Sequence, residues 1–281
     1  MHGFAEKWNM SVRWNWVDAL KSELLRSSDA NRLCVIAVDW AELARGGLLV
    51  ANYWRAIDNM QLAADLLAPY LRANQLPAEQ LHCVGFSLGA HMCSILGKTY
   101  SRLYGGVKLG RITGLDPAGP FYANKPSSEK LTHTDATLVD IVHTSDNFGL
   151  AETNGHMDFY PDRGPSAIAA CDTDLETRYD TYENVVLYEE GNGDAENVVK
   201  VTLTEAEIEE QGGLDRLTVK SILGRIGAFF DKYFAQKPKQ VFTKLHQFFG
   251  CSHLMSVRFF MSSVNQCYFW SRMCASYEEY N

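Results

Sequence analysis

Short apolar runs alternate with an amphipathic stretch along the first half of the chain. The runs of strand length are Leu33 to Val38, Leu81 to Gly85, Val107 to Leu115 and Thr137 to His143. Asn52 to Arg72 is amphipathic and long enough for a helix. Predicted strands that alternate with predicted helices are typical of a largely parallel sheet covered by helices on both faces. The pattern therefore predicts an α/β fold.

The pattern changes after residue 171. Asp172 to Gln211 is rich in Asp and Glu and has little helical periodicity, which predicts a mobile or disordered insert. From Leu217 to Gln236 apolar residues return at helical spacing with charged residues between them. This stretch is predicted to form an amphipathic helix. It either packs on the domain or forms a lid that turns its apolar face to a lipid surface.

Composition indicates one large domain over residues 1–281. The chain is 46% hydrophobic and can bury a substantial core without a repeat or a structural metal. Its formal net charge of −8 argues against nucleic-acid binding, for which a basic stripe is expected. No apolar run reaches the roughly 18 residues that a membrane span needs, so we expect no transmembrane span.

A glycine-flanked serine follows one apolar run. In Gly85-Phe86-Ser87-Leu88-Gly89 the serine lies between a predicted strand and a predicted helix, Ala90 to Tyr100. This is the context of a nucleophile elbow, where a strained turn projects the hydroxyl and flanking glycines remove colliding side chains. The alternative is an ordinary glycine-rich turn. The strand before Ser87 and the helix after it favour a catalytic serine.

Two further segments supply the partners that a serine nucleophile needs. Asp116 follows an apolar run and precedes a proline, which places a carboxylate at the end of a strand. His253 lies far downstream, before the apolar stretch Val257 to Met261. The chain order Ser, Asp, His is that of the α/β-hydrolases. Ser87, Asp116 and His253 are therefore the candidate nucleophile, acid and base.

These segments together resemble the pancreatic-lipase family, particularly its insect lipase and phospholipase A1 branch. In the family's order, the matching segments are His2 to Phe4, Val38 to Trp40, Gly85 to His91, Gly114 to Pro120, Ile141 to Thr144, Asp158 to Pro161 and Cys251 to His253. The resemblance implies an α/β-hydrolase fold, with Ser87 as nucleophile, His253 as base and Asp116 holding the imidazole. It also implies an oxyanion hole made by the backbone N–H groups of Phe4 and Leu88.

Phe86 departs from the family pattern, because many relatives carry histidine there, although that position has no proton-transfer role. Further histidines and carboxylates lie in family-like segments, and we interpret them as hydrogen-bonded structural groups: His91, His143, His156, Asp39, Asp140 and Asp158.

The chain has seven cysteines. The resemblance implies two disulfides, one closing a lid over residues 172–250 and one closing a short C-terminal loop: Cys171–Cys251 and Cys267–Cys274. Cys34, Cys83 and Cys93 remain in apolar contexts, where we expect small buried hydrophobes. None of the cysteines makes a CxxC pair, so a structural zinc site is not expected.

The family's calcium site does not carry over residue by residue. Asp135 matches one acidic ligand position, but Thr132 and Ser127-Ser128 stand where further ligands are expected. Calcium takes six or more oxygen ligands, so we expect no metal, and no cofactor.

The start of the sequence lacks two features that are expected of the family. No strand precedes His2 to anchor the oxyanion loop, and the first residues have no signal-peptide pattern. We therefore expect an N-terminally truncated sequence of a secreted protein. The sequence ends shortly after Cys274, so the family's C-terminal β-sandwich is not expected.

The expected function is hydrolysis of lipid carboxylic esters, triacylglycerol or phospholipid, through an acyl-enzyme at a lipid interface. One alternative is a catalytically silent lipid-binding or yolk-type protein on the same fold, against which the intact Ser87, Asp116 and His253 argue. A second is a soluble short-chain esterase, which a test for activation by lipid aggregates distinguishes from a lipase.

Overall fold

A computed structural model describes residues 1–3, 16–26, 33–44, 49–145, 148–161, 198–202 and 239–265. Four parallel strands form its main sheet in the order β2-β3-β4-β5: β2 (His82–Phe86), β3 (Leu109–Leu115), β4 (Ala136–Val142) and β5 (Met157–Phe159). The register aligns Phe86 with Leu115, Leu115 with Val142 and Val142 with Phe159. The carboxyl ends of all four strands therefore meet at one edge.

A second, two-stranded parallel sheet joins β1 (Val35–Asp39) to β6 (Val198–Thr202). β6 corrects the prediction that the whole of Asp172 to Gln211 is mobile or disordered. Its sequence, Val-Val-Lys-Val-Thr, is rich in β-branched residues that fit a strand, but it is short and surrounded by acidic sequence. The strand was not predicted because the surrounding acidic composition is typical of disordered segments.

Residue 1 extends the hydrogen bonding of β2 toward β1. The Met1 amino group donates to the Val84 carbonyl at 2.6 Å, and the Phe86 N–H donates to the Met1 carbonyl at 3.1 Å. The segment ending at Gly3 is thus held along the free edge of β2 by backbone bonds of the kind that join strands.

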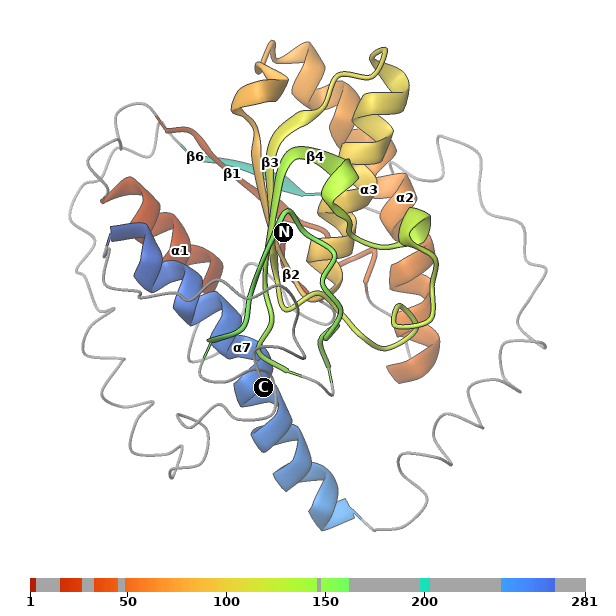
Figure 1. Cartoon of the computed structure of the whole chain (residues 1–281), viewed down its shortest axis with the longest axis vertical. Coiled ribbons are helices and arrows are strands. Elements are labelled where there is room, and N and C mark those ends of the chain that lie inside the picture. Colours follow the sequence, from red (N-terminus) through yellow and green to blue (C-terminus); the bar gives the residue numbers. More distant parts are fainter. Residues whose placement is uncertain are drawn as a thin grey trace.

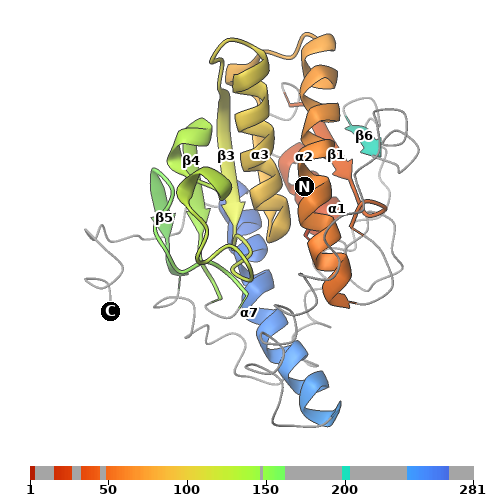
Figure 2. The ribbon, with the colours of Figure 1, turned by 90° about the vertical axis from the view of Figure 1, so that its right-hand side faces the viewer.

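Helices cover both faces of the main sheet (Figures 1 and 2). α2 (Leu49–Ala73) and α3 (Leu88–Leu103) pack together on one face, while α1 (Trp16–Leu25) and α7 (Lys239–Asn265) pack together on the other. Three short 3₁₀ helices complete the described elements: η2 (Ala78–Gln80), η3 (Ser127–Glu129) and η4 (His133–Asp135). This arrangement confirms the predicted α/β fold. Within the described ranges, no helix is long and apolar enough to cross a membrane.

Two apolar clusters form the core, one on each face of the sheet. The larger lies under α2 and α3, and its largest fully buried side chains include Trp40, Met60, Met92 and Tyr100. The smaller lies under α1 and α7 and consists of Trp16, Leu20, Phe86, Leu115, Val142 and Val257. Both clusters reach the strand ends that carry the candidate site.

The predicted strands and helices that fall within the described residues are confirmed with small shifts of their ends. β2 begins and ends one residue later than its apolar run, and α3 begins at Leu88, two residues before its predicted start. Leu88 thus directly follows Ser87. The predicted helix from Leu217 to Gln236 lies outside the described residues.

The cysteines require a correction. Cys83 of β2 and Cys93 of α3 form a disulfide, whereas we expected both as free thiols. Because α3 packs back onto the strand that precedes it, the two Cα atoms come within 5.8 Å, a separation that only the folded strand–turn–helix unit provides. Cys34 is free as predicted, but exposed rather than buried, because it precedes β1 instead of lying inside it. The predicted pairs Cys171–Cys251 and Cys267–Cys274 involve residues outside the described part.

Candidate active site

Ser87 occupies the sharp turn between β2 and α3. Its φ of 56° and ψ of −120° lie in a backbone region that residues other than glycine rarely adopt. The glycines on either side are required by close approach: a Cβ at Gly85 would collide with the Gly89 carbonyl, and one at Gly89 with the Met1 carbonyl. The local structure is therefore the strained strand–turn–helix that the motif predicts, and the turn is packed directly against residue 1.

Asp116 lies at the end of the neighbouring strand. Because β2 and β3 are parallel and Phe86 pairs with Leu115, Ser87 and Asp116 are the residues that follow the paired positions. The Ser87 N–H donates to the Leu115 carbonyl at 3.0 Å, and the Ala118 N–H donates to the Ser87 carbonyl at 3.2 Å. These bonds fix the two candidate residues side by side.

The Asp116 carboxylate is fully buried and held by three donors. Its Oδ1 accepts the backbone N–H of Thr144 at 2.8 Å and of Ser145 at 3.1 Å. Its Oδ2 lies 2.6 Å from the Nδ1 of His253. A Cβ at position 149 would strike Oδ1, so Gly149 leaves the room that the carboxylate needs. These three donors hold the carboxylate in one orientation.

His253 reaches this edge from α7, which crosses the face opposite α3. With Nδ1 donating to Asp116, the neutral imidazole carries its lone pair on Nε2, the atom that a general base uses. The ring also contacts Phe86, with centroids 4.5 Å apart, and Phe148, at 5.8 Å. Since Phe86 directly precedes Ser87, the imidazole lies beside the nucleophile elbow.

The segment before Phe4 is held by β1. The Trp40 indole N–H donates to the His2 carbonyl at 2.9 Å, and the Trp40 backbone N–H donates to the His2 ring at 3.2 Å. Asp39 lies 3.3 Å from the same ring nitrogen and also accepts the Ala41 N–H. Phe4 itself lies outside the described residues. Leu88, the other predicted oxyanion donor, is the first residue of α3, where helix geometry leaves backbone N–H groups without helical partners.

The remaining histidines of the family-like segments are hydrogen-bonded, as predicted; His91 and His143 are buried, whereas His156 is exposed. The Nδ1 of His91 accepts the Leu131 N–H, its Nε2 donates to the Ala118 carbonyl at 2.9 Å, and its ring stacks on Tyr122. Burial lowers the pKa of His91 to about 3. His143 bonds Asp158 at 2.7 Å, and His156 accepts the Val139 N–H.

Asp140 also has a structural role in the sheet. It accepts two bonds from Arg111, at 2.7 and 2.9 Å, and further bonds from Thr113, which join β3 to β4. The hydrogen bond to Asp140 is the main cause of the raised pKa of Arg111.

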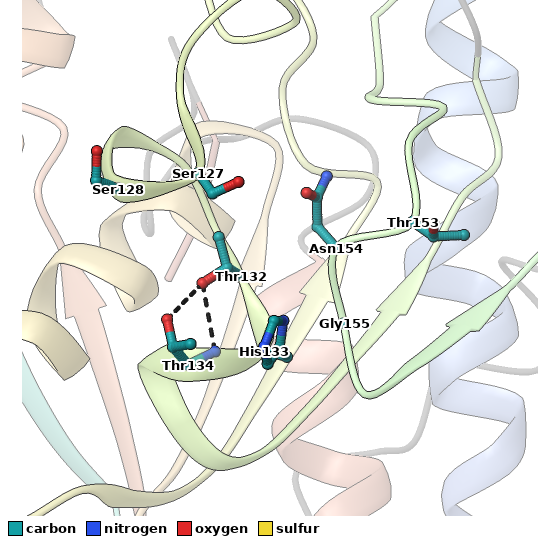
Figure 3. A pocket seen from close by; sticks show the side chains of 8 residues that line it. All are labelled: Ser127, Ser128, Thr132, His133, Thr134, Thr153, Asn154 and Gly155. Carbon is teal, nitrogen blue, oxygen red and sulfur yellow. Dashed lines mark hydrogen bonds between the residues drawn. The ribbon is translucent and has the colours of Figure 1, made fainter.

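A pocket of about 430 Å³ is lined by none of the candidate residues Ser87, Asp116 and His253 (Figure 3). It is lined by Ser127, Ser128, Thr132, His133, Thr134, Thr153, Asn154 and Gly155, so it includes the positions considered for calcium. Asp135, the one acidic candidate, accepts the Ser94 hydroxyl at 2.6 Å and the Thr132 N–H at 2.9 Å, and Lys98 lies 3.3 Å away. These donors already satisfy and neutralise the carboxylate, so the residues do not fit a calcium ion.

Some site features were missed from the sequence. The two amides that bind Asp116 belong to residues following β4, and Phe148 follows them. The only available signal was that His143 and Thr144 end the apolar run of β4, which places them at the same sheet edge as Asp116. Backbone donors have no sequence signature of their own, and the Cys83–Cys93 pairing depends on how α3 packs.

Comparisons with known proteins identify the family of the chain. A family model described as Lipase matches residues 1–186. Lipase member H of Xenopus tropicalis is 40% identical over 153 residues, covering 53% of this chain and 31% of that protein. Phospholipase A1 member A of Bos taurus is 34% identical over 183 residues, covering 64% and 36%. The matched segment thus spans about a third of the length of these relatives. On the family match, the chain belongs to the lipase family, the pancreatic-lipase family of the sequence prediction.

Proposed function

We propose that this protein hydrolyses carboxylic esters of lipids, with triacylglycerol or phospholipid as substrate. The observation that carries the proposal is the buried Asp116 carboxylate, bound by two amides and by His253 at 2.6 Å, beside a strained serine elbow. The printed names of the relatives, lipase and phospholipase A1, support the same class of reaction.

In the proposed mechanism, the Ser87 hydroxyl attacks the ester carbonyl while the Nε2 of His253 takes its proton. The negative charge on the carbonyl oxygen is stabilised by the backbone N–H groups of Leu88 and Phe4. His253 then gives its proton to the departing glycerol oxygen, which leaves an acyl group on Ser87. Water, deprotonated by the same histidine, attacks the acyl-enzyme and releases the fatty acid.

Asp116 acts on His253 through orientation and charge. Its Oδ2 keeps the proton on Nδ1, so that Nε2 is free to accept the serine proton. The two amides on Oδ1 hold the carboxylate in position, and their donation supports its negative charge while the imidazolium exists.

Substrate preference and lid movement belong to the same proposal. A triacylglycerol lipase and a phospholipase A1 use the same triad and oxyanion donors, so preference depends on surface loops and on the lid. We propose that the insert at residues 172–250 contains that lid, that the Cys171–Cys251 bond closes it, and that the protein acts outside the cell at a lipid interface.

The test is fatty-acid release from triolein and from phosphatidylcholine by the purified protein, with Ser87→Ala as the matched variant. The proposal predicts release from at least one lipid and loss of at least about a thousandfold in Ser87→Ala, because the acyl-enzyme cannot form. Unchanged release by Ser87→Ala, or none from either lipid by folded wild-type protein, contradicts it.

A further inference from the structure

The ring of Phe86 packs against the imidazole of His253. The two centroids are 4.5 Å apart with planes inclined at 44°, and Phe148 contacts the same imidazole at 5.8 Å. Phe86 is 5% exposed, and the His253 side chain is 13% exposed. The imidazole is thus bound at Nδ1 by a carboxylate, lies against two aromatic rings and is largely shielded from water.

We propose that Phe86 is a positioning residue that stabilises the imidazolium form of His253 during ester hydrolysis. The inference rests on the proposed function, because the imidazolium affects the reaction rate through the step in which His253 takes the proton of Ser87. An aromatic face attracts a cation within about 6 Å of its centroid, and the attraction grows when water is excluded. The Phe86–His253 separation lies well inside that range.

Phe86 is itself held in place by α1. Trp16 contacts its ring edge-on, with centroids 6.0 Å apart and planes at 76°. The Phe86 N–H donates to the Met1 carbonyl, and its side chain shares the smaller core cluster with Leu115 and Val142. α1 therefore supports the side chain that contacts His253, and it also packs on α7, the helix that carries His253.

The chemistry of a phenyl ring suits this role. A phenyl ring has no atom that binds a proton, so it can stabilise a neighbouring cation without competing for the proton that His253 transfers. A leucine at the same position would keep the apolar surroundings and most of the volume but lack the aromatic face. Phe86→Leu therefore separates the effect of the ring from that of burial.

The test compares Phe86→Leu with Phe260→Leu in lipid-ester hydrolysis. Phe260 lies on the same helix as His253 and packs on the same cluster, but its ring contacts His82 instead. We expect Phe86→Leu to lower kcat about 3- to 30-fold with KM nearly unchanged. We also expect the acidic limb of its pH–rate profile to move to lower pH, since the imidazole protonates less readily without the ring. Phe260→Leu should keep kcat and KM within about twofold of wild type.

Equal kcat and equal pH profiles in the two folded variants overturn the proposal, and so does a lower kcat in Phe86→Leu with an unmoved acidic limb. If Phe86→Leu does not fold, Phe148→Leu replaces it, with the same shift expected at smaller size. Ser87→Ala is measured in parallel. If its hydrolysis persists, the proposed function itself fails, which is a different outcome from a failure of the Phe86 inference.

Discussion

Ser87 and Asp116 share a backbone property that places their side chains. Their φ values are 56° and 43°, both in the left-handed half of the map that L residues rarely enter. Such conformations cost of the order of 1–3 kcal/mol each and persist only where surrounding structure enforces them. Here the Ser87 and Asp116 N–H groups donate to the Leu115 and Val142 carbonyls, which holds both turns at adjacent strand ends. The strain is thus stored where the proposed chemistry occurs.

Asp116→Asn should abolish most activity without unfolding the protein. The two amides on Oδ1 keep the amide oxygen there, so the new NH₂ group faces the Nδ1 of His253. The imidazole must then accept at Nδ1 and carry its proton on Nε2, where it cannot take the serine proton. We expect kcat to fall about 10³- to 10⁴-fold, measured on the preferred lipid with circular dichroism to verify folding. Activity within tenfold of wild type would show that Asp116 does not set the tautomer.

At the scale of elements, the unit β2–turn–α3 is the structural centre of the site. The Cys83–Cys93 disulfide joins its strand to its helix, and Met1 packs over both sulfurs, with its own sulfur 3.8 Å from each. The sequence predicted this strand, turn and helix because periodicity and glycine spacing are local. It did not predict the disulfide, because the pairing depends on how the helix folds back onto the strand.

Removing this disulfide should destabilise the protein while leaving the elbow chemistry possible. A Cys83→Ala/Cys93→Ala variant is expected to lower the free energy of unfolding by about 2–4 kcal/mol, because the unfolded chain gains freedom and the core loses packed sulfur. Denaturant titration of wild type and variant measures the change. Cys34→Ala, which removes an exposed free thiol, is the control and should change stability by less than about 0.5 kcal/mol. Equal stabilities of the double variant and wild type would contradict a stabilising disulfide between β2 and α3.

At the scale of the whole molecule, the order of the strands brings distant sequence together. Residues 87, 116, 144–145 and 253 lie together because the parallel strands β2, β3 and β4 end at one edge and α7 crosses the opposite face from α3. The candidate triad could be predicted, since each member lies in a sequence segment with its own signal. The amides on Asp116 and the rings around His253 could not, because they depend on tertiary packing. β6 escaped prediction for a compositional reason, its acidic surroundings.

The free energy of unfolding should decrease as the pH falls, and protonation of His91 in the unfolded chain should account for part of this decrease. Burial lowers the pKa of His91 to about 3, so the folded state excludes a proton that the unfolded chain binds once the pH drops below about 6.5. The His91 contribution to folding is therefore fully present above that pH and is lost between about 6.5 and 3, at up to about 1.4 kcal/mol per pH unit. Denaturant unfolding at several pH values measures the slope. His91→Gln should show a shallower slope, and an identical slope would contradict the buried neutral imidazole.

In the proposed function Ser87 is a nucleophile activated by His253. The most direct measurement is covalent labelling with a serine-directed dialkyl 4-nitrophenyl phosphate, followed by peptide mass spectrometry. In the predicted reaction the Ser87 oxygen bonds to phosphorus and 4-nitrophenolate leaves, while His253 takes the serine proton. We expect one adduct, on Ser87, formed at least about a hundredfold more slowly in His253→Ala. An adduct on another residue, or folded protein that takes no label at Ser87, would contradict it.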